Sequence, residues 1–165
     1  LGSDVPFAIA GGIAVGRGRG DQLTPALARG TYHWVVAMAG TGLSTPAVYK
    51  ECDRLREGLD IARPQTSEQL LSALRAADAR AVGEALTNDL QAAACSLRPT
   101  LRLVLDVGEE YGALGGIVSG SGPTIAFLVA DADGAESLAQ KLHIEGYRAL
   151  ATSGPAAGAI IREED

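Results

Sequence analysis

The stretch GGIVSGSGPTIAFLV, residues 115–129, constrains the fold of this chain more than any other. Two apolar runs flank a turn of serine, glycine and proline, so the stretch predicts two antiparallel strands joined as a hairpin. TYHWVVAMA, residues 31–39, is rich in β-branched and aromatic residues and predicts another buried strand. The chain is therefore expected to contain an antiparallel sheet.

Helical patterns dominate the remainder of the chain. Capping residues, prolines and apolar faces predict helices over 44–55, 66–77, 78–97, 99–112 and 133–146. The capping predictions include a Thr-x-x-Gln box at 66–69 and a capping pair of Asp133 and Glu136. Short strands and turns are expected over 10–23, 147–153 and 158–163. This order predicts an α+β fold, an open antiparallel sheet with helices packed mainly on one face.

The composition of the chain argues against some classes of function. The chain has 165 residues and a formal net charge of −6, so it lacks the basic footprint of a nucleic-acid binder. No apolar run approaches the length of a membrane span, and no membrane partner is expected. Cys52 and Cys95 lie in no metal-ligand pattern, so no metal site is expected in this chain. We interpret them as two reduced thiols, which are typical of a cytoplasmic protein.

Four short motifs could carry chemistry, and each also has a plain structural interpretation. SGSGPT (119–124) is either a hairpin connection or a nest of N–H groups for an anion. GRGRGD (16–21) is either a solvated loop or a cationic loop beside a polyphosphate. LSTPAVY (43–49) is either a capped helix start or a surface that binds a planar base. Asp4 in LGSDVPF is either a turn residue or a catalytic carboxylate.

In order and spacing, these motifs resemble the later part of the diphosphocytidyl-methylerythritol kinase family. That family belongs to the superfamily of galactokinase, homoserine kinase, mevalonate kinase and phosphomevalonate kinase. LGSDVPF is the most specific element, and SGSGPT resembles the third motif of the superfamily. The resemblance implies that residues 1–29 are the last strands of an ATP-binding domain and that residues 30–165 form a ferredoxin-like, substrate-side domain. The family's ATP-binding loop has no counterpart here, so an N-terminal segment is expected to be missing.

The resemblance also implies an activity and roles for seven residues. The family uses ATP and Mg²⁺ to phosphorylate the 2-hydroxyl of diphosphocytidyl-methylerythritol, and Asp4 stands where the family has its catalytic aspartate. The other roles implied are contacts with a small-molecule substrate: Arg19 at its diphosphate, Thr45 as a hydrogen-bond partner, Tyr49 against the cytosine, and Gly120, Ser121 and Gly122 between substrate and nucleotide.

Two alternatives stay open. The chain could belong to another kinase of the superfamily, of homoserine or mevalonate type, although these resemble it at GSGP and not at LGSDVPF with STPAVY. It could also be a non-catalytic α+β module that binds a small molecule. Without a nucleotide loop, the chain by itself is expected to be inactive.

Overall fold

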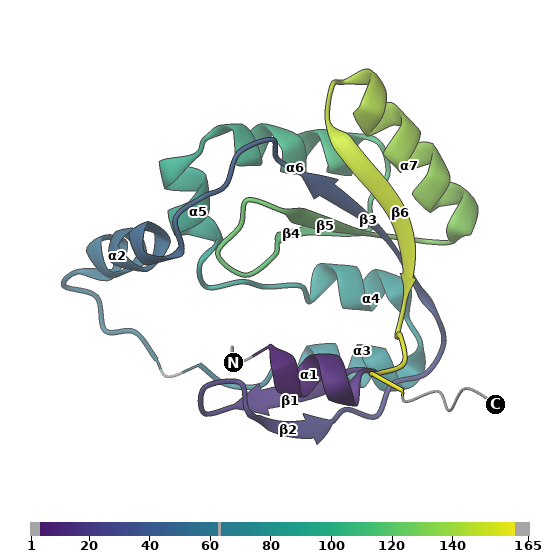
Figure 1. The fold of residues 1–165 in the computed structure, drawn as a ribbon, viewed down its shortest axis with the longest axis horizontal. Coiled ribbons are helices and arrows are strands. Elements are labelled where there is room, and N and C mark those ends of the chain that lie inside the picture. The colour runs from purple at the N-terminus through teal and green to yellow at the C-terminus, as the bar shows by residue number, and fades with distance from the viewer. Residues whose placement is uncertain (1–3, 63, 161–165) are drawn as a thin grey trace.

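The structure is a computed structural model that describes residues 4–62 and 64–160 (Figure 1). Its strands are β1 (Ala14–Arg17), β2 (Gln22–Pro25), β3 (Tyr32–Met38), β4 (Gly115–Val118), β5 (Ile125–Val129) and β6 (Arg148–Gly154). Its helices are α1 (Val5–Ala10), α2 (Thr45–Arg56), α3 (Glu68–Ala76), α4 (Ala79–Glu84), α5 (Gln91–Leu97), α6 (Thr100–Glu110) and α7 (Ala132–Ile144).

The main sheet has four antiparallel strands in the order β4–β5–β3–β6. The expected hairpin is confirmed, since β4 pairs with β5 in a register that places Val118 opposite Ile125. The expected central strand is confirmed as β3, which pairs with β5 on one side and β6 on the other. Strands β1 and β2 form a separate hairpin. The α+β class is thus confirmed.

Alternation along the strands divides the core between the two faces of the main sheet. On one face, Val35 and Phe127 belong to the larger cluster, which also takes residues from α2, α5, α6 and α7. On the other face, Tyr32 and Leu128 join a smaller cluster with residues of α3 and α4. Figure 1 shows α6 and α7 on one side of the sheet and α4 on the other. Most of the helical cover therefore lies on one face, as expected.

The fully buried ring of Phe127 occupies a space that two glycines leave open. A Cβ atom on Gly108 of α6 would lie 2.1 Å from Cε1 of this ring, and one on Gly116 of β4 would lie 2.8 Å from Cδ1. Helix α6 can approach the sheet this closely only because both positions lack a side chain. Close packing of this kind leaves no room for an added methyl group.

Replacing Gly108 by alanine is expected to destabilise the protein. Overpacking a core costs about 1–3 kcal/mol, which outweighs the gain of about 1 kcal/mol from alanine in a helix. Urea denaturation should show a lower free energy of unfolding for this variant. A second substitution, Phe127→Leu, should restore part of that free energy, because the smaller side chain makes space for the added methyl group. A Gly108→Ala variant as stable as the original protein would contradict the described packing.

Three details of the helices differ from the sequence-based expectations. The expected helix over 78–97 is two helices, α4 and α5, because residues 85–90 leave the helical path and the Asn88 side chain bonds to the β4–β5 hairpin. The cap of α3 is Ser67, which accepts a hydrogen bond from the Leu70 N–H, in place of a box that opens at Thr66. The cap of α7 is Asp131, which accepts from the Gly134 N–H, in place of the pair at 133 and 136.

Both ends of the chain also differ from expectation. Residues Val5–Ala10 form a short helix that Gly11 ends at a φ of +64°, where only strands and turns were expected. The strand expected over 158–163 is wrong for its described part, residues 158–160, although Gly11 and Ala157 form a single β-bridge. Residues 161–163 lie outside the described residues. Among the described residues, no helix is long and apolar enough to cross a membrane.

Candidate functional site

The turn between β4 and β5 has a defined backbone conformation. The Ser119 N–H donates to the Thr124 carbonyl at 2.8 Å, and the Gly122 N–H donates to the Ser119 carbonyl at 2.9 Å. Gly120 and Gly122 adopt φ values of +56° and +78°, a region that disfavours residues with a side chain. The turn is thus a compact loop with two residues, Gly120 and Ser121, at its tip.

The beginning of α2 lies against this turn. The Thr45 Oγ1 and Ser121 Oγ atoms are 2.8 Å apart and share a hydrogen bond, although the two residues are 76 positions apart in the sequence. Ser44 caps the helix by accepting from the Ala47 N–H at 3.4 Å, and Pro46 has no N–H to offer. The N–H groups at this helix start are thus largely absent or occupied, and the Thr45 hydroxyl is the polar group that meets the turn.

Tyr49 follows Thr45 by one helical turn. Residues four positions apart share one face of a helix, so the phenol side chain lies on the same side of α2 as the Thr45 hydroxyl. Its side chain is 55% exposed although it is large and mostly apolar. The ring is therefore available to pack against a ligand.

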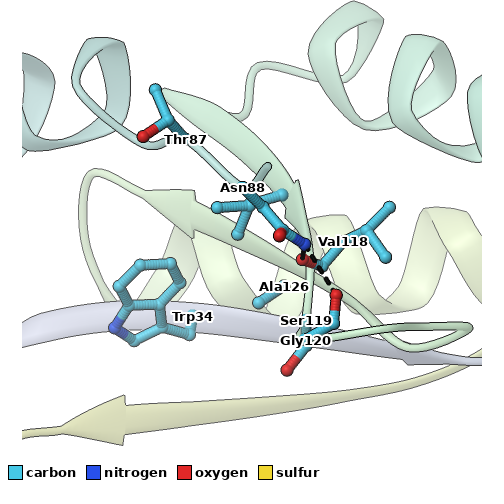
Figure 2. Close-up of a pocket in the computed structure, with 8 residues that line it drawn as sticks. Trp34, Thr87, Asn88, Val118, Ser119, Gly120 and Ala126 are labelled. Atoms are coloured by element: carbon cyan, nitrogen blue, oxygen red, sulfur yellow. Dashed lines mark hydrogen bonds between the residues drawn. The ribbon is translucent and has the colours of Figure 1, made fainter. Parts of the chain in front are cut away.

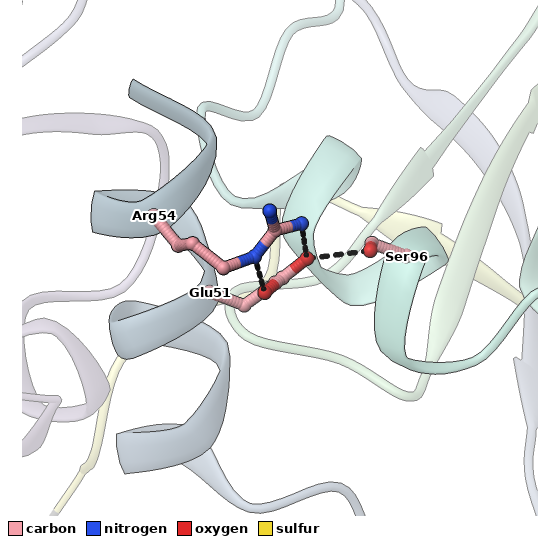
Figure 3. Close-up of polar contacts among 3 residues, drawn as sticks. All are labelled: Glu51, Arg54 and Ser96. Carbon is pink, nitrogen blue, oxygen red and sulfur yellow. Dashed lines mark hydrogen bonds and ion pairs between the residues drawn. The ribbon is translucent and has the colours of Figure 1, made fainter. Parts of the chain in front are cut away.

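A polar cluster fixes α2 against α5 (Figure 3). Arg54 donates to both carboxylate oxygens of Glu51, at 2.7 and 2.8 Å, and the Ser96 hydroxyl of α5 donates to the same carboxylate at 2.6 Å. These hydrogen bonds lower the pKa of Glu51 to about 2. Because the pKa is lowered, the interaction is present at neutral pH and is lost only as the pH falls through about 2.

The segment between α4 and α5 holds the turn from its other side (Figure 2). The Asn88 side chain donates to the carbonyls of Val118 and Gly120, both at 2.7 Å. Beside it lies a hollow of about 420 Å³, lined by Trp34, Thr87, Asn88, Ile117, Val118, Ser119, Gly120 and Ala126. Sequence reasoning missed Asn88 because it fell inside an expected helix.

The structure brings five of the seven candidate residues together and leaves two apart. Thr45 on α2 meets the turn that contains Gly120, Ser121 and Gly122, and Tyr49 follows Thr45 one helical turn along α2. Arg19 lies in the exposed β1–β2 turn, where its N–H donates to the Asp21 carboxylate at 3.1 Å. Asp4 is exposed at the start of α1. Figure 1 shows α1, β1 and β2 together, away from α2.

This arrangement offers hydroxyl groups, turn N–H groups and an exposed aromatic ring, which suit a ligand with anionic and planar parts. The described residues contain no group of three His, Cys, Asp or Glu side chains that could hold a metal ion. By themselves, the described residues therefore offer no cluster of side-chain ligands for Mg²⁺.

Comparison with known proteins shows which proteins the chain is similar to. Residues 70–148 match the family described as "GHMP kinases C terminal". A curated 4-diphosphocytidyl-2-C-methyl-D-erythritol kinase of Pseudarthrobacter chlorophenolicus is 52% identical over 164 residues, covering 98% of this chain and 51% of that relative. Residues 70–148 are thus similar to the C-terminal part of the GHMP kinases, and 98% of the chain is similar to part of a curated kinase. It spans about half the length of the curated relatives it matches.

Solved GHMP kinase structures share the fold. A crystal structure of 4-(cytidine 5'-diphospho)-2C-methyl-D-erythritol kinase superposes with a TM-score of 0.69 at 31% identity, covering 85% of this chain and 48% of that one. Homoserine kinase from Cytophaga hutchinsonii superposes with a TM-score of 0.66 at 15% identity, covering 93% of this chain and 50% of that one. The second likeness concerns the fold alone. The expected α+β fold of this kinase superfamily is therefore confirmed.

Proposed function

We propose that the intact protein, meaning the gene product that contains this chain, is an ATP-dependent kinase that phosphorylates the 2-hydroxyl of diphosphocytidyl-methylerythritol. The observation that carries this proposal is the 52% identity over 98% of the chain to curated kinases named for that substrate. The contact between Thr45 and Ser121 supports it, because it joins two of the motifs that resemble that family. We place the enzyme in the cytoplasm, where this class of small-molecule kinase would meet its substrate.

Different residues contact different parts of the substrate. The exposed ring of Tyr49 packs against the cytosine, and the Thr45 hydroxyl hydrogen-bonds to the substrate one helical turn away. Gly120, Ser121 and Gly122 form the wall between the substrate and the nucleotide. Arg19 contacts the diphosphate of the substrate from the β1–β2 turn. The Glu51 cluster keeps α2 in place while these contacts form.

Two domains are part of the proposal. Residues 1–29 belong to an ATP-binding domain, and residues 30–165 form the substrate-side domain. The separate β1–β2 sheet is consistent with this division, because β1 and β2 do not join the four-stranded sheet. ATP is bound mainly by a preceding segment that is not in this chain, and Mg²⁺, when bound there, neutralises charge on the phosphates.

The chemical step requires little covalent chemistry from the residues of this chain. The substrate hydroxyl oxygen attacks the γ-phosphorus of ATP, the bond from that phosphorus to the bridging oxygen breaks, and ADP leaves. Asp4 accepts the proton of the hydroxyl or orients it. Phosphoryl transfer depends mostly on positioning and on stabilising charge, and Thr45, Tyr49 and the turn supply the positioning.

A comparison of substrates tests the proposed function. The intact protein is assayed for ADP release with diphosphocytidyl-methylerythritol, homoserine and mevalonate as alternative alcohols. We expect kcat/KM to be highest for the first by orders of magnitude. Preference for homoserine or mevalonate would assign a different kinase of the superfamily, and transfer to none of the three would favour a binding module without catalysis.

Replacing Tyr49 by alanine is expected to weaken binding of the cytidine substrate five- to a hundred-fold. Stacking of a base on an aromatic ring contributes about 1–3 kcal/mol. Tyr49→Phe serves as the matched control and should bind nearly normally, because the ring and not the hydroxyl makes the contact. Calorimetric titration of the intact protein measures both. Normal affinity of the alanine variant would mean that this face of α2 does not contact the base.

A further inference from the structure

Strand β4 lies at the edge of the main sheet, yet side chains satisfy the backbone groups of its last residue, Val118. At Val118, the N–H donates to Gln91 Oε1 at 2.9 Å and the carbonyl accepts from Asn88 Nδ2 at 2.7 Å. Two side chains three residues apart thus take the place of a neighbouring strand. This use of residues 88–91 explains why the helix expected there is interrupted.

Asn88 extends this contact from the strand into the turn. Its Nδ2 carries two protons, and the second is donated to the Gly120 carbonyl at 2.7 Å. Its Oδ1 accepts from the Leu90 N–H at 2.9 Å, which fixes the orientation of the amide. Figure 2 shows the two bonds, which leave the Asn88 amide nitrogen for the carbonyls of Val118 and Gly120. Both donors of this side chain are therefore committed, and only an amide of this size supplies both.

The bond to Gly120 also determines where the next N–H points. The Gly120–Ser121 peptide is planar and trans, so the Gly120 carbonyl and the Ser121 N–H point in opposite directions. The same relation holds two peptides earlier, where the Val118 carbonyl accepts from Asn88 and the Ser119 N–H donates to the Thr124 carbonyl. Within the described part of the chain, no protein acceptor is found for the N–H groups of Gly120 and Ser121.

We propose that Asn88 is a positioning residue, which holds the Gly120 carbonyl so that the Ser121 N–H faces an anionic phosphoryl group in the site. This inference rests on the proposed function for the identity of that group. The neighbouring hydroxyl of Ser121, beside Thr45, lies at the same tip of the turn. Asn88 thus acts through the backbone and does not touch the ligand.

Two amide-to-carboxylate substitutions, three residues apart, test the proposal in the intact protein. Asn88→Asp removes both donors and places a carboxylate against two carbonyl oxygens. Gln91→Glu adds the same charge three residues away but keeps an oxygen that accepts from the Val118 N–H. We expect Asn88→Asp to lower kcat about 10- to 100-fold, with the KM for diphosphocytidyl-methylerythritol within threefold, because a preorganised donor acts mainly on the transition state. Gln91→Glu should stay within twofold in both constants.

The pH profile separates positioning from a general loss of structure. A protonated carboxyl can donate one hydrogen bond, so the ratio of the Asn88→Asp rate to the original rate should rise as the pH is lowered. A variant that is simply misfolded would not recover in this way. Equal losses in the two variants, or a kcat of Asn88→Asp within twofold of the original, would overturn the proposal.

A binding measurement that needs no turnover tests this inference separately from the proposed function. Inorganic pyrophosphate is titrated into ¹⁵N-labelled intact protein, and the amide resonances of Ser121 and Gly120 are followed. The Ser121 resonance should shift in the original protein and in Gln91→Glu, and the shift should be lost in Asn88→Asp. If all three proteins respond alike, or if the Ser121 resonance of the original protein does not respond, Asn88 does not aim this group at an anion. Failure to phosphorylate any alcohol, with these shifts intact, would refute only the proposed function.

Discussion

Asp4→Asn is expected to lower the kcat of the intact protein by a factor of about 10²–10⁴ while leaving the KM for the cytidine substrate nearly unchanged. Proton transfer to a positioned carboxylate typically accelerates a reaction by a factor of about 10²–10⁴. The carboxylate acts in the transition state and not in substrate binding, so kcat changes and KM does not. Asparagine has nearly the same shape but cannot accept the proton. Steady-state kinetics with ADP release as the signal measures both constants.

The structure makes this substitution a clean test. The Asp4 side chain makes no capping hydrogen bond to α1, and the Ala8 N–H bonds to the Asp4 backbone carbonyl, which asparagine keeps. The thermal stability of the variant should therefore be close to that of the original protein. Asp133→Asn, which removes the same charge from an exposed position on α7, is the matched control and should retain full activity. An Asp4→Asn enzyme with a near-original kcat would remove Asp4 from the mechanism.

The 165-residue chain by itself is expected to fold, to show no turnover and to bind no Mg-ATP at micromolar concentration. Folding is expected because the four-stranded sheet and its helices bury a continuous cluster that includes Val35, Phe127 and Leu138. Circular dichroism and a cooperative thermal transition check the fold, and calorimetric titration with Mg-ATP checks binding.

The reason for the missing affinity lies in the helix starts and the turns of this chain. A triphosphate is normally held by free N–H groups at the start of a helix behind a glycine-rich loop. The loop at 40–44 leads into α2, but Pro46 has no N–H and the Ala47 N–H is bonded to Ser44. The turn at 119–124 joins two strands, so it has no helix behind it. Micromolar binding of Mg-ATP or turnover above background would show that the nucleotide site lies within these 165 residues.

Local patterns predicted those elements that depend mainly on their own residues. Strand β3 was predictable from its run of β-branched and aromatic residues. The β4–β5 hairpin was predictable from two apolar runs around a glycine-containing turn. The start of α2 was predictable because Ser44 caps it and Pro46 suits its first turn. In such segments the sequence neighbours supply the hydrogen bonds that decide the structure.

Segments held by distant residues were not predictable in this way. The interruption at Asn88 depends on carbonyls 30 and 32 positions away, although Asn88 and Asp89 are poor helix formers and could have raised doubt about a helix there. Gly11, which ends α1, lies where an added Cβ would be 2.1 Å from the Gly158 nitrogen. Both features follow from contacts between parts of the chain that no local pattern connects.

The candidate site shows the same division. The family resemblance directed attention to Thr45, Tyr49 and the turn at 119–124, and the structure places Thr45 beside Ser121. Neither composition nor spacing predicts that 2.8 Å contact across 76 positions. The roles of all seven residues stay predictions, and α1 and the β1–β2 turn lie away from α2 (Figure 1).

Analysis of the reaction product tests the central claim most directly. The intact protein is incubated with ATP, Mg²⁺ and diphosphocytidyl-methylerythritol, and phosphorus and carbon NMR of the product identify the hydroxyl that carries the new phosphate. The account predicts a single new phosphate on the 2-hydroxyl of the methylerythritol unit, with one ADP formed for each product molecule. A phosphate on any other hydroxyl, or an unchanged substrate in the presence of folded intact protein, would contradict it.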